Sequence, residues 1–138
     1  MFTDGADTTS RMSEQEVIDY AERLTRAALA DLPDGEWSFE DWIDDDGVDY
    51  GKPIRLFVTI RKKADHMVVD WTGTSPQVRG AINNTLSYTK SASYTGVRSV
   101  LPQNIPNNEG VFRAIEVICP PGTVGHGVLP AACAARGL

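Results

Sequence analysis

The sequence lacks the features that mark secreted and membrane proteins. Only two of its 138 residues are cysteine, Cys119 and Cys133, so a disulfide framework is excluded and both are interpreted as packing residues in a reducing compartment. No apolar run approaches the roughly 20 residues that a membrane-spanning helix requires. The acidic N-terminus has neither the basic nor the apolar region of a secretory signal. A cytoplasmic protein is therefore expected.

Motifs for catalysis and metal binding are also scarce. The chain contains no Gly-x-Ser-x-Gly elbow and no phosphate-binding glycine loop. The acidic segment 41–49 does not fit an EF-hand, because Gly47 at the sixth position would put Trp42 at the first. The two cysteines and His126 are spaced unlike a compact zinc motif and lack a fourth ligand. We therefore predict no metal or other cofactor in this chain and assign no catalytic residue.

Charge is distributed unevenly along the chain. Residues 1–50 contain 15 acidic and 3 basic side chains, whereas residues 51–138 contain 4 acidic and 10 basic ones. The basic residues are scattered rather than clustered with aromatics, so nucleic-acid binding is not expected. We expect the two halves to neutralise each other, either within the fold or across a larger subunit.

Periodicity predicts an α+β domain. Ser13 and Glu16 form a capping box before an amphipathic N-terminal helix, and Glu22 and Arg26 are spaced for an ion pair within it. A mainly antiparallel sheet of about four strands is expected over residues 36–43, 54–61, 66–71 and 111–119, with a hairpin turn at 62–65.

The first of these strands alternates aromatic and polar residues, which is typical of a half-buried strand. A second, buried helix is predicted over residues 86–101, ended by Pro102 and followed by a loop over 102–110. Residues 1–12 are expected to be frayed or disordered, residues 13–138 to form a single domain, and the C-terminal tail to be irregular.

The segment 70–84, Asp-Trp-Thr-Gly-Thr-Ser-Pro-Gln-Val-Arg-Gly-Ala-Ile-Asn-Asn, concentrates hydroxyl, amide and guanidinium groups between turn residues. Such loops are either well-tied turns or binding loops on a rigid scaffold, and both interpretations stay open. A guanidinium can hold a carboxylate or phosphate, and an amide can hold a planar amide. The candidate substrate-binding or interface residues are Thr74, Ser75, Gln77, Arg79, Asn83 and Asn84, with His126 between two glycines.

This segment closely resembles a signature of the hydantoinase B/oxoprolinase family. Residues 32–35 and 44–49 upstream, and 104–110 and 112–117 downstream, resemble the same family in the same order, so that the resemblance covers residues 20–132. B-type subunits of that family are several times longer, which implies an internal fragment from the middle of such a subunit. The family's metal-site region, with its Asn-Asp-Pro-type segment and histidines, has no counterpart here.

The resemblance implies a function as part of an ATP-dependent enzyme that opens cyclic amides such as hydantoin, 5-oxoproline or a lactam. An A-type partner subunit would bind ATP with magnesium, and the remainder of the B-type subunit would bind a divalent metal. The chain is expected to be inactive alone. Two alternatives remain: a small non-catalytic structural or interaction subunit that binds the A-type ATPase, and a fragment of a ketone carboxylase subunit.

Overall fold

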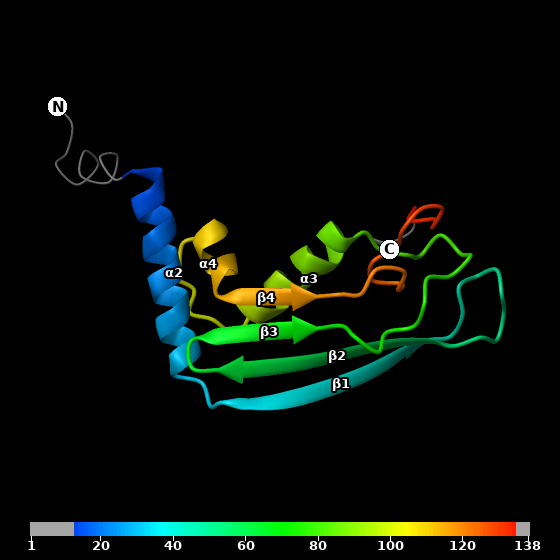
Figure 1. Ribbon diagram of the computed structural model, residues 1–138, viewed down its shortest axis with the longest axis horizontal. Helices are drawn as coiled ribbons and strands as arrows, with labels where there is room; N and C mark the ends of the chain where they lie inside the picture. The colour runs from blue at the N-terminus through cyan, green and yellow to red at the C-terminus, as the bar shows by residue number, and fades with distance from the viewer. Residues whose placement is uncertain (1–12, 135–138) are drawn as a thin grey trace.

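Four strands lie side by side in the order β1-β2-β3-β4 (Figure 1). The computed structural model describes residues 13–134, so the predictions for residues 1–12 lie outside it. Strands β1 (Gly35–Ile43), β2 (Ile54–Lys63) and β3 (His66–Asp70) are antiparallel neighbours, and β4 (Ile115–Ile118) runs parallel to β3. The helices are α2 (Glu14–Ala30), α3 (Leu86–Arg98) and α4 (Glu109–Arg113). The predicted α+β class and mainly antiparallel sheet are confirmed.

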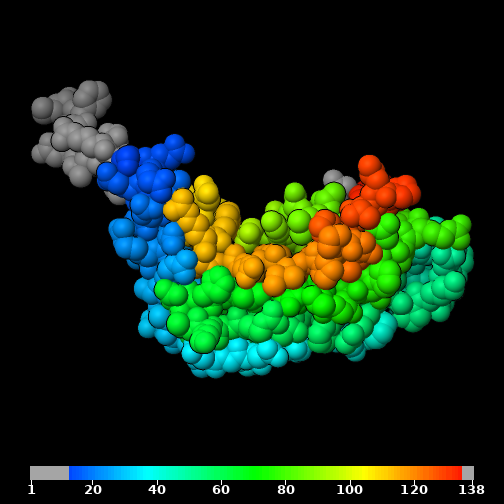
Figure 2. All heavy atoms as spheres, viewed as in Figure 1, coloured from blue at the N-terminus to red at the C-terminus, as the bar shows by residue number. Residues whose placement is uncertain are grey.

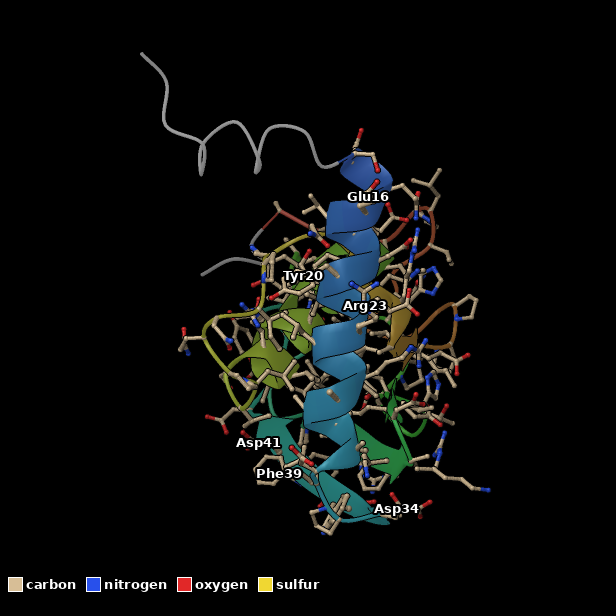
Figure 3. All side chains as sticks on the ribbon, turned by 90° about the vertical axis from the view of Figure 1, so that its left-hand side faces the viewer. Glu16, Tyr20, Arg23, Asp34, Phe39 and Asp41 are labelled. Atoms are coloured by element: carbon tan, nitrogen blue, oxygen red, sulfur yellow. The ribbon has the colours of Figure 1, made fainter. Side chains whose placement is uncertain are left out.

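Helix α2 begins where the sequence predicts, because the Ser13 hydroxyl accepts the Glu16 N–H at 3.1 Å. Its apolar face buries Ala21 and Leu29 completely, while Tyr20 on another face is 42% exposed. Figure 3 shows α2 in front of the molecule, with Glu16, Tyr20 and Arg23 along its length. No helix within residues 13–134 combines the length and apolar character needed to cross a membrane.

Helix α4 occupies positions for which the sequence predicted a loop and the start of a strand. The Asn108 side chain accepts the Gly110 N–H at 2.8 Å and so caps the helix. Gly110 approaches α2 so closely that a β-carbon there would lie 2.0 Å from the Ile18 carbonyl oxygen. Val111 is fully buried by this contact. The strand predicted over residues 111–119 is therefore shortened to β4, because packing against α2 outweighs the strand-like apolar run.

Two further boundaries differ from the prediction. Helix α3 ends at Arg98 instead of Leu101, because the chain tightens into a turn in which the Leu101 N–H donates to the Arg98 carbonyl at 3.2 Å. Lys63 still pairs within the β2–β3 ladder, so the hairpin turn consists only of Ala64 and Asp65. Ala64 accommodates this short turn by adopting a φ of 53°.

The sheet has an apolar inner face and a polar outer face. On the inner face, Met67, Val69 and Ile115 are buried and join the core formed with the helices. On the outer face, cross-strand ion pairs form, with 2.7 Å between Arg61 and Asp70. Residues alternate between these faces along each strand, which is the pattern that the sequence predicts for a half-buried sheet.

Strand β1 departs from that pattern, because every one of its residues is exposed although it pairs with β2 along its whole length. The prediction of a half-buried first strand is therefore wrong for this chain. Trp37 and Phe39 on the inner face are 50% and 66% exposed, because the helices pack mainly on β3 and β4. Phe39 and Asp41 lie on the same side of β1 (Figure 3). The exposed Trp37 and Phe39 side chains thus form an apolar strip along β1.

The acidic first half of the chain and its basic second half meet within the fold. The buried Lys62 ammonium lies 2.7 Å from Asp34 and also donates to the Leu32 carbonyl. The hydrogen bond from Lys62 is the main reason that the pKa of Asp34 is lowered. Arg113 on α4 pairs in the same way with Asp19 on α2, at 3.2 Å. Intramolecular pairing thus accounts for part of the charge asymmetry.

Candidate functional site

The polar segment 70–84, here named the polar loop, and the C-terminal segment 119–134 lie at the end of the sheet opposite α2 (Figure 1). In Figure 2 the surface is hollowed between α4 and the C-terminal segment, which is coloured orange to red. Backbone hydrogen bonds join the two segments. The Asn84 N–H donates to the Val124 carbonyl at 2.7 Å, and the Val124 N–H donates to the Ser75 carbonyl at 3.0 Å. The backbone of Val124 therefore holds the loop at both Ser75 and Asn84.

Thr74 and Ser75 attach the loop to β2. The Thr74 hydroxyl donates to the Phe57 carbonyl at 3.0 Å and accepts the Phe57 N–H at 3.1 Å. The Ser75 hydroxyl accepts the Arg55 N–H at 2.8 Å. These two side chains satisfy backbone groups on the edge of β2 that faces β3, at positions beyond the end of β3. Both hydroxyls are thus used in holding the loop.

Gln77 attaches the loop to the C-terminal segment, and His126 stabilises the C-terminal segment itself. The Gln77 side-chain oxygen accepts the Val128 N–H at 2.9 Å. The half-buried His126 ring places Nδ1 2.9 Å from the Cys119 carbonyl oxygen. A carbonyl can only accept, so Nδ1 carries the proton and the ring orientation is fixed. Cys119 is itself buried, and this burial raises the pKa of its thiol.

Asn83 is fully buried and uses its whole side-chain amide in bonds to the protein backbone. Its Oδ1 accepts the Val78 N–H at 2.8 Å. Its Nδ2 lies 2.8, 3.2 and 2.9 Å from the carbonyl oxygens of Val78, Gly80 and Ala132, and its two hydrogens are shared among these three acceptors. The amide therefore closes the loop on itself and connects it to the C-terminal segment, leaving no side-chain group for a ligand.

Asp46 fixes the acidic turn to this loop, a role that the sequence did not reveal. Its buried carboxylate accepts the N–H groups of Asp49, Val48 and Gly80 at 2.6, 2.9 and 2.8 Å. The bond from Asp49 contributes most to lowering the pKa of Asp46, followed by the bond from Val48. An acidic run gives no sign of which carboxylate turns inward, because the third donor is distant in sequence.

Arg79 lies between two open hollows on the surface. Its guanidinium is 74% exposed and pairs with Asp49 at 3.0 Å. One hollow, of about 310 Å³, is lined by both charges of this pair and by Lys52. The other, of about 400 Å³, is lined by Arg79, Gln77 and the segment 130–132. Both signs of charge meet at the first hollow, so it has no marked preference for an anion.

Asn84 differs from its neighbour because its Oδ1 is buried and has no hydrogen-bond partner within residues 13–134. Its backbone is fixed, since the N–H donates to Val124 and the carbonyl accepts the Gly127 N–H at 2.8 Å. An unpaired buried acceptor costs about 1–3 kcal/mol of stability. Asn84 lines a cavity of about 100 Å³, here named the Asn84 cavity, with Leu56, Trp71, Thr74, Tyr88, Thr89, Ala92 and Gly125.

The other polar groups around the Asn84 cavity are already paired. The Trp71 indole N–H donates to the Ser93 hydroxyl at 2.9 Å. The Thr89 hydroxyl donates to the Gly125 carbonyl at 2.5 Å. Thr74 is occupied by β2 as described. The cavity therefore presents carbon-rich walls, whereas the unpaired Asn84 Oδ1 is itself shielded from solvent.

The candidate residues do not form one site. Thr74 and Asn84 share the Asn84 cavity, whereas Gln77 and Arg79 share two hollows, one beside the acidic turn and one beside the segment 130–132. Sequence reasoning missed the aromatic walls, because a tryptophan after a strand and a tyrosine on a helix look like ordinary core residues. No group of three or more His, Cys, Asp or Glu side chains within residues 13–134 could hold a metal ion.

The comparisons with known proteins agree on a family. The sequence model of the hydantoinase B/oxoprolinase family matches residues 3–138. A protein of Pseudomonas sp. (strain NS671), described as the B-type subunit of a D-/L-hydantoinase, is 37% identical over 142 residues, which cover 96% of this chain and 24% of that protein. This chain thus spans about a quarter of the length of that relative.

Two solved structures have the same fold. The crystal structure of the ATP-dependent caprolactamase from Pseudomonas jessenii aligns with a TM-score of 0.75 and 27% identity, over 93% of this chain and 23% of that one. A nucleotide-free acetone carboxylase aligns with a TM-score of 0.78 over 96% of this chain and 20% of that one, but at 12% identity it supports the fold alone. With the family match over nearly every residue, the chain belongs to the hydantoinase B/oxoprolinase family.

Proposed function

We propose that this chain forms part of the B-type subunit of a cytoplasmic, ATP-dependent enzyme that acts on cyclic amides. The single observation that carries the proposal is the family match over residues 3–138. The hydantoinase relative and the caprolactamase structure support it, because both names describe action on a cyclic amide. An A-type partner subunit would bind ATP with magnesium, and the substrate would be a hydantoin, 5-oxoproline or a lactam.

Within such an enzyme, the polar residues of the loop would have a structural role and would not take part in the reaction. Thr74, Ser75 and Asn83 use their side chains in bonds to the protein backbone. The residues present do not fit a divalent metal, because no suitable ligand group exists within residues 13–134. A metal would therefore need ligands from the remainder of the B-type subunit, and no step is assigned to it here. The chain alone is proposed to be inactive.

The test uses native protein isolated from the source cells with an antibody raised against this chain. The isolate is incubated with ATP and, in separate reactions, hydantoin, 5-oxoproline or caprolactam, and ADP release is measured. We expect ADP release that depends on one of the cyclic amides, and none from the purified 138-residue chain. ADP release that depends instead on acetone and bicarbonate would overturn the proposal in favour of ketone carboxylation.

The apolar strip on β1 favours a second candidate function, a non-catalytic interaction subunit that binds the A-type partner. Trp37 and Phe39 are largely exposed on a strand whose outer edge is unpaired in the described part of the chain. Size-exclusion chromatography of the purified chain with the A-type partner tests this function. Co-elution that the Phe39→Ser substitution abolishes would support it, and separate elution would contradict it.

A further inference from the structure

Strand β1 forms an open edge of the sheet, because within residues 13–134 no other strand pairs with its outer side. In Figure 1 it lies along the lower margin of the molecule, and in the space-filling view of Figure 2 it forms the lower rim. All of its residues are exposed. None of them is a proline or a lysine, the residues that commonly keep an edge strand from pairing with another chain. The edge is therefore open to a further strand.

The hydrogen bonds of β2 show which β1 residues direct their backbone groups toward this edge. On β2, the backbone N–H and carbonyl groups of Arg55 and Phe57 bond to the polar loop instead of to β1. Their partners on β1 are Trp42 and Glu40. Residues that face each other in an antiparallel pair either both form ladder hydrogen bonds or both do not. The backbone groups of Trp42 and Glu40 therefore point to the open edge, as do those of the alternate residues 36 and 38.

Arginines on β2 offset the acidic side chains of the open edge. The Arg55 guanidinium lies 2.5 Å from the Glu40 carboxylate, and this hydrogen bond is the main reason that the pKa of Glu40 is lowered. Glu36 faces Arg61 in the β1–β2 ladder. Because each glutamate has a positive charge beside it, the repulsion between two such edges is reduced.

The order of the side chains selects one way to pair β1 with a second copy of itself. A two-fold axis places one residue opposite the same residue of the second copy, and near the middle of β1 this residue is Ser38, Phe39 or Glu40. With the axis at Ser38, Glu36 meets Glu40 of the second copy, and with the axis at Glu40 the two Glu40 side chains meet. Like charges directly opposite each other are destabilising. The axis at Phe39 avoids both contacts and pairs every outward residue, 36 with 42 and 38 with 40.

We propose that two copies of this chain associate by antiparallel pairing of their β1 strands about Phe39, which joins the two sheets into one. The backbone groups at the open edge supply the hydrogen bonds of this β-strand addition. Phe39 faces Phe39 of the second copy in a non-hydrogen-bonded pair, the arrangement in which opposite side chains lie closest. Aromatic pairs at such positions stabilise a sheet. The apolar strips of the two copies thereby become continuous.

The residues beside Phe39 also gain partners in this arrangement. In the single chain the Asp41 carboxylate accepts the Trp42 N–H at 2.8 Å, a backbone donor that points to the open edge. The Trp37 indole N–H has no hydrogen-bond partner within residues 13–134. Strand pairing gives the Trp42 N–H to the Glu36 carbonyl of the second copy. The released Asp41 carboxylate then faces Trp37 of the second copy and can accept its indole N–H.

Sedimentation equilibrium of the full 138-residue chain tests the proposal, and we expect a reversible dimer of two 15.0 kDa chains. Ser38 would face Glu40 of the second copy, so Ser38→Lys should tighten the dimer and Ser38→Glu should weaken it, each by about threefold to tenfold. Thr59→Lys is the matched control, because Thr59 pairs with Ser38 but lies one strand away from the open edge. It should leave the dissociation constant within about twofold of the wild-type value.

A further variant tests the backbone pairing itself. Ser38→Pro removes an outward N–H but no bond of the β1–β2 ladder, and proline is tolerated at such edge positions. We expect this variant to keep a folded circular dichroism spectrum and to be monomeric. A wild-type chain that stays monomeric, or a dimer that a folded Ser38→Pro variant leaves unchanged, would overturn the proposal. Equal effects of lysine and glutamate at position 38 would overturn it as well, because they would exclude the pairing about Phe39. These measurements use no ATP and no partner subunit, so their failure leaves the proposed enzyme function to its own assay.

Discussion

Gly80 donates its N–H to the Asp46 carboxylate at 2.8 Å, across 34 residues of sequence. The two backbones are also in direct contact, because a β-carbon on Gly80 would lie 2.0 Å from the Asp46 carbonyl oxygen. One hydrogen bond and one close approach thus fix the acidic turn against the polar loop. Only glycine allows both at this position.

Substituting Gly80→Ala should lower the free energy of unfolding by about 3 kcal/mol, because two rigid backbone segments must separate. Urea denaturation measures the change. Gly96→Ala is the matched control, since no atom lies within 4 Å of a β-carbon there and Gly96 is inside α3. Alanine at that helical position should stabilise the chain by about 0.5–1 kcal/mol. Equal effects at both glycines would contradict the close contact.

Asp46 should make the stability of the fold depend on pH. Its folded pKa lies below the ordinary aspartate value of about 3.9, so its contribution is complete above that value and is lost as the pH falls through the folded pKa. Asp46→Asn should lower the melting temperature at pH 7 and reduce its decline below about pH 4. Asp44→Asn, at an exposed position in the same turn, should change neither. Parallel melting curves for wild type and Asp46→Asn would argue against this role.

Asn83 and Asn84 are adjacent amides that should respond to leucine in opposite ways. Asn83→Leu removes every side-chain hydrogen bond of a fully buried amide and leaves the N–H and carbonyl of Val78 and the carbonyl of Gly80 without their side-chain partner, so unfolding should become easier by about 3 kcal/mol. Asn84→Leu removes an acceptor that has no partner, so stability should rise by about 1 kcal/mol. Chemical denaturation of both variants tests this contrast, which would not hold if Asn84→Leu were the more damaging change.

Local signals in the sequence were sufficient for the elements that depend on neighbouring residues. Ser13 predicted the start of α2 because a helix cap needs only residues three positions away. The predicted pair of Glu22 and Arg26 forms at 2.9 Å for the same reason. The sequence predicted that the polar segment 70–84 is either a turn fixed by its own side chains or a binding loop. The structure shows that hydroxyl and amide side chains of this segment bond to the backbone and fix it.

Long-range contacts explain what the sequence could not predict. Helix α4 forms where Gly110 meets Ile18, a pairing that no local pattern contains. The inward turn of Asp46 depends on Gly80, and the Asn84 cavity depends on α3 meeting the end of the sheet. The alternation in β1 predicts an apolar face correctly, but periodicity cannot say whether another element covers that face.

Serine substitutions can measure how far other elements cover the inner face of the sheet at β1 and at β3. Phe39→Ser should change the free energy of unfolding of the isolated chain by no more than about 0.5 kcal/mol, because Phe39 is 66% exposed. Val69→Ser, on the same face but 3% exposed beneath the helices, should cost about 2–4 kcal/mol. Phe39→Ser should also reduce self-association in analytical ultracentrifugation, because it interrupts the apolar strip on β1. If Phe39→Ser proved as costly as Val69→Ser, β1 would have to be covered in solution, and the strip would not be free to bind a partner.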